Sequence, residues 1–170
     1  EYDRGAFVYV DAPAPFKFAD YAGGRDPAVD AILAGEEMRS IANIALADGG
    51  ASAREAIARR VSENARYDWW TPPPFEDLKR VGYDLLEDFN RPEDAVEIFT
   101  ALIELYPESW NSWESLGRAQ VAAGDENAAR QSYKCSLAID PDTFEDGDLR
   151  ALIDASETEV RMPAGCPVRE

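Results

Sequence analysis

The sequence predicts an all-α fold, a solenoid of about three helix hairpins, and two observations carry this prediction. The first is that residue types recur 34 positions apart: Ala95 and Ala129, Phe99 and Tyr133, Pro107 and Pro141. Internal repetition at such a spacing is typical of stacked helical hairpins. The second is that apolar residues follow a helical period from about residue 26 onward, with capping residues and prolines between the segments.

The N-terminal segment, residues 1–25, differs in pattern from the rest of the chain. The run AFVYV has β-branched and aromatic residues typical of a strand, but Pro13, Pro15 and the Gly23–Gly24 pair interrupt any regular continuation. We therefore expect an extended N-terminal arm that includes one short edge strand at most.

Helical periodicity begins at Asp26. Asp26 is a favoured N-cap residue and Pro27 suits the first helical position, so a helix is expected from here to the Gly49–Gly50 pair. A second helix is expected over residues 51–70. Within these two segments, residues 38–63 are expected to form a degenerate first hairpin with the two glycines as its turn.

Two better hairpins are expected over residues 75–107 and 108–141. A proline ends each of them, because proline disfavours the helical conformation in the residue before it. A C-terminal capping helix is expected over about residues 145–158, where apolar residues alternate with acids at helical spacing. The helical domain is thus expected to span residues 26–160, with a C-terminal tail over residues 161–170.

The second unit resembles the tetratricopeptide repeat. Seven of its residues fall on signature positions of that family: Trp113, Leu116, Gly117, Gly124, Ala129, Tyr133 and Pro141. Two others, Gln120 and Ser136, depart from positions where the pattern prefers an aromatic residue and an alanine. The first unit is looser, because Lys79 stands where Trp113 stands in the second and Gly82 lies 35 residues before Gly117. We therefore expect one extra residue in its inter-helix turn, DFNRPED.

Three runs carry a narrower resemblance: GGASAREAIARR, LKRVGYDLL and FTALIELYPESWNSWESLGRAQVAAGDENAARQSY. They are similar to the helical tails that follow the catalytic domain in bacterial serine hydrolases of the beta-lactamase and penicillin-binding type. This resemblance implies an accessory module. The chain contains no SxxK, GxSxG or KTG motif, so no catalytic residue is carried over.

In tetratricopeptide arrays the first helices of the hairpins line a concave groove, and the resemblance places eight candidate partner-binding residues there. They are Lys79, Tyr83, Leu86 and Glu87 in the first unit and Asn111, Glu114, Arg118 and Val121 in the second. Such a groove can hold an extended peptide or a partner helix. Lys79 and Arg118 are cations on an acidic protein, which would suit a partner with a carboxylate terminus. The alternative is that the groove packs on the N-terminal arm or on an absent catalytic domain.

Charge excludes several partner classes. The 34 acidic residues outnumber the 17 basic ones and give a net charge of −17, so phosphate backbones are repelled and nucleic acid is not expected. No window of 18 consecutive apolar residues occurs, so membrane insertion is not expected either. A solvated acidic surface that aids solubility is the simplest interpretation, and attraction of a basic partner is the alternative.

Chemistry is limited by the absence of histidine, which removes imidazole bases and most zinc sites. The aspartate-rich run DPDTFEDGDL fails the EF-hand pattern, because Phe144 and Glu145 stand at its fifth and sixth positions. The pairs Glu93–Asp94 and Asp125–Glu126 suit helix N-termini better than catalysis. We therefore expect no enzyme activity, no cofactor and no metal.

Two residue sets remain open. Cys135 and Cys166 are either a buried small side chain and an exposed thiol or, if the chain is exported, a disulfide. The tryptophans Trp69, Trp70 and Trp110 are either packing between hairpins or part of a contact surface.

The function expected from the sequence is non-enzymatic binding of a protein or peptide, as a scaffold or accessory module. The alternatives are an accessory domain of a serine hydrolase and a purely structural or dimerisation domain. The chain begins at Glu1 instead of Met, which suggests that an upstream segment was removed, either a signal peptide or the rest of a larger protein. We expect an exported or a cytoplasmic protein, with a slight preference for export. The sequence indicates neither the oligomeric state nor the identity of the partner.

Overall fold

A computed structural model of the chain describes residues 22–24, 39–66, 70–141 and 161–167. The chain divides into two compact units, Glu1–Ser40 and Ile41–Glu170. Most of the first unit lies outside the described residues, and so does most of the expected N-terminal arm, of which Ala22 is helical and Gly23–Gly24 form a turn. The expected capping helix over about residues 145–158 also lies outside them.

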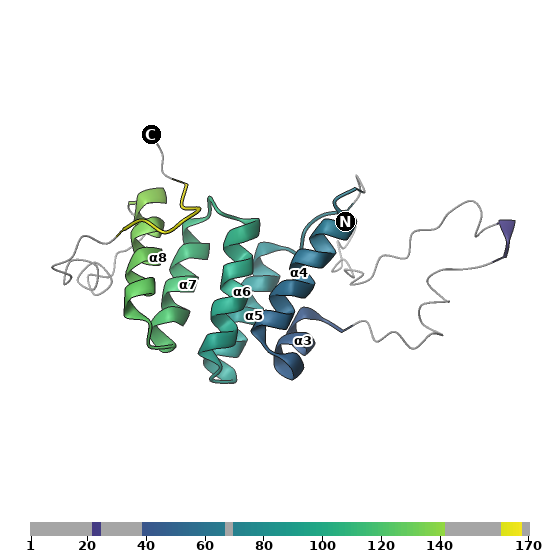
Figure 1. Cartoon of the computed structure of the whole chain (residues 1–170), viewed down its shortest axis with the longest axis horizontal. Helices are drawn as coiled ribbons and strands as arrows, with labels where there is room; N and C mark the ends of the chain where they lie inside the picture. The colour runs from purple at the N-terminus through teal and green to yellow at the C-terminus, as the bar shows by residue number, and fades with distance from the viewer. Residues whose placement is uncertain (1–21, 25–38, 67–69, 142–160, 168–170) are drawn as a thin grey trace, which may run out of the picture. The chain divides into compact units, whose positions relative to one another are not determined.

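The second unit is all-α within its described residues, where no strand occurs. Six α-helices pack in sequential pairs, and a short π-helical turn, η1, extends one of them (Figure 1). They are α3 (Ile41–Asp48), α4 (Gly50–Asn64), α5 (Phe75–Tyr83) with η1 (Asp84–Asp88), α6 (Pro92–Leu105), α7 (Trp110–Ala122) and α8 (Glu126–Ile139). In Figure 1 the turns inside the pairs lie along the lower edge, and the connections between pairs lie along the upper edge.

The first pair differs from its prediction at both ends. A continuous helix from Asp26 to residue 48 is wrong, because Arg39 and Ser40 are not helical and α3 begins at Ile41. Serine is a favoured N-cap residue, which is consistent with a helix that starts directly after Ser40. The second helix ends at Asn64 and does not reach residue 70, and the Asn64 side-chain amide donates to the Arg60 carbonyl oxygen at 2.8 Å. Asparagine often binds the backbone in this way near helix ends.

The turn between α3 and α4 depends on two glycines with different roles. Gly49 has a φ of 95°, which favours glycine, whereas Gly50 is already the first residue of α4. A Cβ on Gly50 would lie 2.5 Å from the backbone oxygen of Asp94, so this position allows α4 to approach the start of α6 closely. Asp94 uses the contact, because its Oδ1 accepts a 2.5 Å hydrogen bond from the Gly50 amide.

The second and third pairs share one packing device. A Cβ on Gly82 would lie 2.5 Å from the Phe99 ring, and a Cβ on Gly117 would lie 2.5 Å from the Tyr133 ring. Phe99 and Tyr133 are almost completely buried. Each ring therefore lies directly against the backbone of the first helix of its own pair.

The extra residue of the first unit lies in a helix and not in the DFNRPED turn. Asn90 and Arg91 stand 34 residues before Gly124 and Asp125, so the two turns have the same length. The offset of 35 that relates Gly82 to Gly117 must therefore change to 34 between residues 82 and 90. This is the position of η1, a π-helical turn whose backbone hydrogen bonds join residues five apart. The Phe89 amide accordingly donates to the Asp84 carbonyl oxygen at 3.0 Å.

This register also corrects the position assigned to Lys79. The residue 35 positions before Trp113 is Leu78, which is 2% exposed like Trp113 itself. Lys79 is instead the counterpart of Glu114. The assignment of Lys79 to the tryptophan position was wrong because it applied the 34-residue offset on the N-terminal side of η1.

Successive pairs are joined by polar contacts as well as by the core. Arg91 donates to the Leu46 carbonyl oxygen at the end of α3 and to Asp94 Oδ2, at 2.7 Å and 2.6 Å. Arg54 on α4 pairs with Glu97 and Glu104 on α6. At the next junction the indole nitrogen of Trp113 donates to the Pro107 carbonyl oxygen at 2.8 Å.

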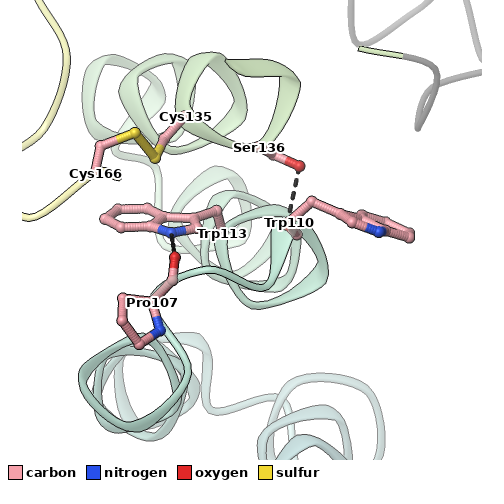
Figure 2. Close-up of a disulfide and its surroundings, with 6 residues drawn as sticks. All are labelled: Pro107, Trp110, Trp113, Cys135, Ser136 and Cys166. Atoms are coloured by element: carbon pink, nitrogen blue, oxygen red, sulfur yellow. Dashed lines mark hydrogen bonds between the residues drawn. A yellow bond between two sulfur atoms is a disulfide. The ribbon is translucent and has the colours of Figure 1, made fainter. Parts of the chain in front are cut away.

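Cys135 and Cys166 form a disulfide that ties the C-terminal tail to α8. Their Cα atoms are 5.8 Å apart, within the usual range for a disulfide, so the alternative of two separate thiols is wrong. Figure 2 shows the indole of Trp113 beside this disulfide, with its nitrogen directed to Pro107. The disulfide therefore covers the tryptophan that joins the second pair to the third.

Replacing Gly117 with alanine is expected to destabilise the fold, because the added methyl group overlaps a buried ring that has no room to move. We expect Gly117→Ala to lower the free energy of unfolding by about 2 to 3 kcal/mol, measured by urea titration. In a Tyr133→Leu background, which removes the ring, the same change should cost less than half as much. An equal cost in both backgrounds would show that the ring contact is not the cause.

Loss of the disulfide should also destabilise the fold. It closes a loop with a sequence separation of 31 residues, for which the chain-entropy model gives about 3 to 4 kcal/mol. We expect Cys166→Ser to lower the free energy of unfolding by this amount, and a thiol reductant to do the same to the unmodified protein. The Cys166→Ser variant is the control for the reductant, since its stability should not respond. A reductant that leaves unfolding of the unmodified protein unchanged would contradict the assignment.

Candidate functional site

The first helices of the three pairs share one register. In each of them two residues four apart are buried against the second helix: Ile41 and Ala45 in α3, Leu78 and Gly82 in α5, Trp113 and Gly117 in α7. The residues that follow the buried ones lie about 100° further round each helix, and their exposure ranges from buried Glu114 to exposed Leu46 and Arg118. These positions, with residues of the neighbouring turns of the same helices, define the first-helix face: Ala42, Leu46, Lys79, Tyr83, Leu86, Glu87, Asn111, Glu114, Arg118 and Val121.

Tyr83 links two of these helices. Its hydroxyl lies 3.1 Å from the Ser115 hydroxyl on α7, and its ring meets the edge of Phe99 at a centroid distance of 5.2 Å. Ser115 in turn lies 3.5 Å from Asn111 Oδ1, one turn earlier on α7. The contact fixes the spacing between α5 and α7 at the centre of the face.

Glu114 and Arg118 form an ion pair on α7. The Glu114 side chain is only 9% exposed, whereas the Arg118 side chain is 53% exposed. A buried carboxylate is costly unless it is paired, so Arg118 is required to compensate Glu114. Its guanidinium is therefore already engaged in the folded chain.

The remaining predicted residues lie along the same face with different exposures. Lys79 Nζ is 5.8 Å from the centre of the Phe75 ring, a distance that permits a cation–π interaction. Leu86 is half-buried against the core, while Glu87 is exposed. Val121 is 43% exposed, which is high for a valine in a helix of this array.

The tyrosines of this region resist ionisation. Burial raises the pKa of Tyr83, and the nearby Glu114 and Glu87 carboxylates add to the shift while Ser115 and Arg118 oppose it. Burial raises the pKa of Tyr133 to about 12, again with Glu114 adding to it. The pKa of Arg118 is also raised, because the Glu114 carboxylate outweighs the opposing effect of burial. Both phenols and the guanidinium therefore keep their protons throughout the neutral range.

Three further residues of the region were missed by sequence reasoning. Leu46 was missed because α3 was expected to continue an earlier helix, although the spacing of Ile41 and Ala45 gives its register. Ser115 was given no role and Tyr133 was identified only as a repeat position. The contact between Tyr83 and Ser115 depends on helix geometry that spacing alone does not give.

The two departures from the repeat pattern have a structural role. Gln120 Oε1 accepts a 2.8 Å hydrogen bond from the Ser132 hydroxyl, and the Ser136 hydroxyl donates to the Trp110 carbonyl oxygen at 2.9 Å. Ser132 and Ser136 are buried, so these bonds satisfy polar groups that would otherwise be costly between α7 and α8.

The other residues that the sequence singled out cap a helix, form an ion pair or are partly buried. Asp125 caps α8, since its carboxylate accepts a 3.0 Å hydrogen bond from the Ala128 amide, as the helix-terminus interpretation predicts. Glu126 pairs with Arg130 on the same helix. Trp110 is half-buried, and Figure 2 shows its indole directed away from the disulfide. Trp70 is half-buried outside any helix, and Trp69 lies outside the described residues.

Neither a metal-ligating cluster nor a membrane-spanning helix occurs among the residues that the structure describes. Among them, no group of three acidic or cysteine side chains is placed to hold a metal ion. None of their helices is long and apolar enough to cross a bilayer. Most of the aspartate-rich run, residues 142–149, lies outside the description.

No protein-family model and no curated protein matches this chain. The resemblances to the tetratricopeptide repeat and to the hydrolase tails thus rest on the residues of this chain alone.

The raised pKa of Tyr133 predicts a loss of stability in alkali. Its pKa is near 10 in an unfolded chain and about 12 in the folded one, so the folded state retains the proton where the unfolded state releases it. This contribution is present in full below pH 10 and is lost as the pH rises through 12, by up to about 2 to 3 kcal/mol.

Urea unfolding between pH 9 and 12, at fixed ionic strength, measures this loss. The Tyr133→Phe variant should show a shallower decline than the unmodified protein, since phenylalanine has no proton to release. The same decline in both would contradict the assignment.

Proposed function

We propose that the chain is a tetratricopeptide-like array and a non-enzymatic binding module that holds a peptide or partner helix on the first-helix face. The observation that carries the proposal is the distribution of exposed apolar side chains. In the part of the chain that the structure describes, three large apolar side chains are exposed: Leu46, Phe89 and Val121. Two of them belong to the first-helix face, and the third follows η1 directly.

The polar residues of the face support the same proposal. Tyr83, Ser115, Glu114 and Arg118 are held by contacts within the protein, so their orientation does not need to be set on binding. A face that is ordered before binding loses less conformational entropy when a ligand arrives. This arrangement favours a recognition surface over a flexible patch.

The disulfide indicates the kind of cellular compartment in which the module works. Disulfides persist in oxidising compartments and are rare in the cytosol. We therefore extend the proposal to a protein that works outside a reducing cytosol.

The test must avoid a variant that fails for structural reasons. Arg118→Ala together with Lys79→Ala would remove the two cations that the resemblance assigns to the groove. Loss of Arg118 would leave Glu114 buried without its cation, however, and this kind of loss is strongly destabilising. Leu46→Ser and Val121→Ser are better choices, because both side chains are exposed and surface changes usually alter stability by about 0.5 kcal/mol or less.

We expect peptides selected from a random display library to bind the unmodified full chain, and to bind the Leu46→Ser/Val121→Ser double variant about tenfold more weakly. Ala58→Ser, an exposed position on α4, is the matched control and should leave affinity unchanged. Fluorescence anisotropy of the selected peptides measures both. If no selected peptide depends on Leu46 and Val121, the proposal is wrong and a purely structural or dimerisation role replaces it.

A further inference from the structure

The three exposed apolar residues lie at the same end of their helix pairs. Leu46 lies in the last turn of α3, Val121 is the second-last residue of α7, and Phe89 directly follows η1. Their exposed fractions are 37%, 43% and 51%. The turns that follow these helices lie along one edge of the array in Figure 1, so the three side chains occupy the same end of their respective pairs.

Acidic residues accompany them at this end. Glu87 and Asp88 of η1 are exposed and directly precede Phe89. Asp125 and Glu126 are exposed too, but Asp125 caps α8 and Glu126, the first residue of α8, pairs with Arg130. The π-helical turn contributes here, since its extra residue lengthens the end of α5 that carries Glu87 and Asp88. We call this set, Leu46, Glu87, Asp88, Phe89 and Val121, the turn end.

The cations near the turn end are already engaged. Arg91 donates to the Leu46 carbonyl oxygen and to Asp94, and Arg118 is paired with Glu114. Lys79 lies about two helical turns before Glu87, near the Phe75 ring, and the next residue, Arg80, pairs with Asp77. The turn end therefore combines exposed apolar groups with negative charge that no cation of these helices offsets. This differs from the carboxylate-binding surface that the two basic residues suggested from sequence.

From this charge and apolar pattern we propose that the turn end binds a cationic amphipathic segment of a protein partner, with apolar side chains on Leu46, Phe89 and Val121 and lysine or arginine toward Glu87 and Asp88. The inference rests on the proposed function and adds the partner class. Complementary charge of this kind sets specificity and association rate, and it weakens with salt.

Two synthetic peptides of one pattern test the proposal. One carries leucine at helical spacing with lysine elsewhere, and its twin has glutamate in place of every lysine. We expect the lysine peptide to bind the full chain at least about tenfold more tightly, and this preference to shrink between about 0.05 M and 0.3 M salt.

Paired charge variants locate the binding. Glu87→Gln with Asp88→Asn should weaken the lysine peptide about fivefold, as expected for two exposed charge pairs. The matched control is Glu63→Gln with Glu108→Gln, which removes two exposed acids from the end of α4 and from the α6–α7 connection. It should change affinity less than twofold, although it alters the net charge equally.

The outcomes separate this inference from the proposed function. Equal affinity for the two peptides, with both weakened by Leu46→Ser and Val121→Ser, overturns the cationic preference and leaves the binding face intact. Equal losses from the two charge pairs overturn the turn end as the location, since attraction would then follow net charge alone. If neither peptide responds to Leu46→Ser and Val121→Ser, both proposals fail.

Discussion

The arrangement of the array depends on the absence of a side chain at Gly82 and Gly117. Each glycine lets an aromatic ring of the second helix lie directly on the backbone of the first, closer than any other residue type would allow. The next residues in sequence, Tyr83 and Arg118, belong to the first-helix face. The contact that closes each pair thus also sets the position of the side chains available for recognition. Ala45 and Leu46 hold the corresponding buried and exposed positions in α3.

The local rules of helix formation account for most of what could be predicted. Prolines, glycines and the spacing of apolar residues predicted the second and third pairs, but they did not predict the length of the turn inside the second pair. The π-helical turn could not be derived in this way, because a single extra residue can lie in a loop or in a helix at similar local cost. Packing decides between them: η1 keeps both Gly82 on the Phe99 ring and Asn90 in the turn. The error at Lys79 followed directly from this undecided choice.

The candidate face was harder to predict than the helices around it. The resemblance to the tetratricopeptide repeat placed Tyr83, Arg118 and Val121 on one face, and they follow buried positions at a common register in the structure. The state of their side chains could not be predicted in this way. The burial of Glu114 depends on tertiary packing around α7. Because Glu114 forms an ion pair with Arg118, the two charges compensate each other at the centre of the face. Spacing identifies which residues share a face, while tertiary contacts determine which charges remain available.

Trp113 has several roles in the third pair, and the disulfide lies beside it in Figure 2. Trp113 is a repeat position by sequence, the donor to Pro107 at the junction between pairs, and the neighbour of the bond between Cys135 and Cys166. An array of a few hairpins buries limited apolar area, and α8 is the last of the described helices, so this end of the array benefits from additional stabilisation. A covalent link from the tail to α8 provides it by restricting the unfolded chain instead of adding buried surface.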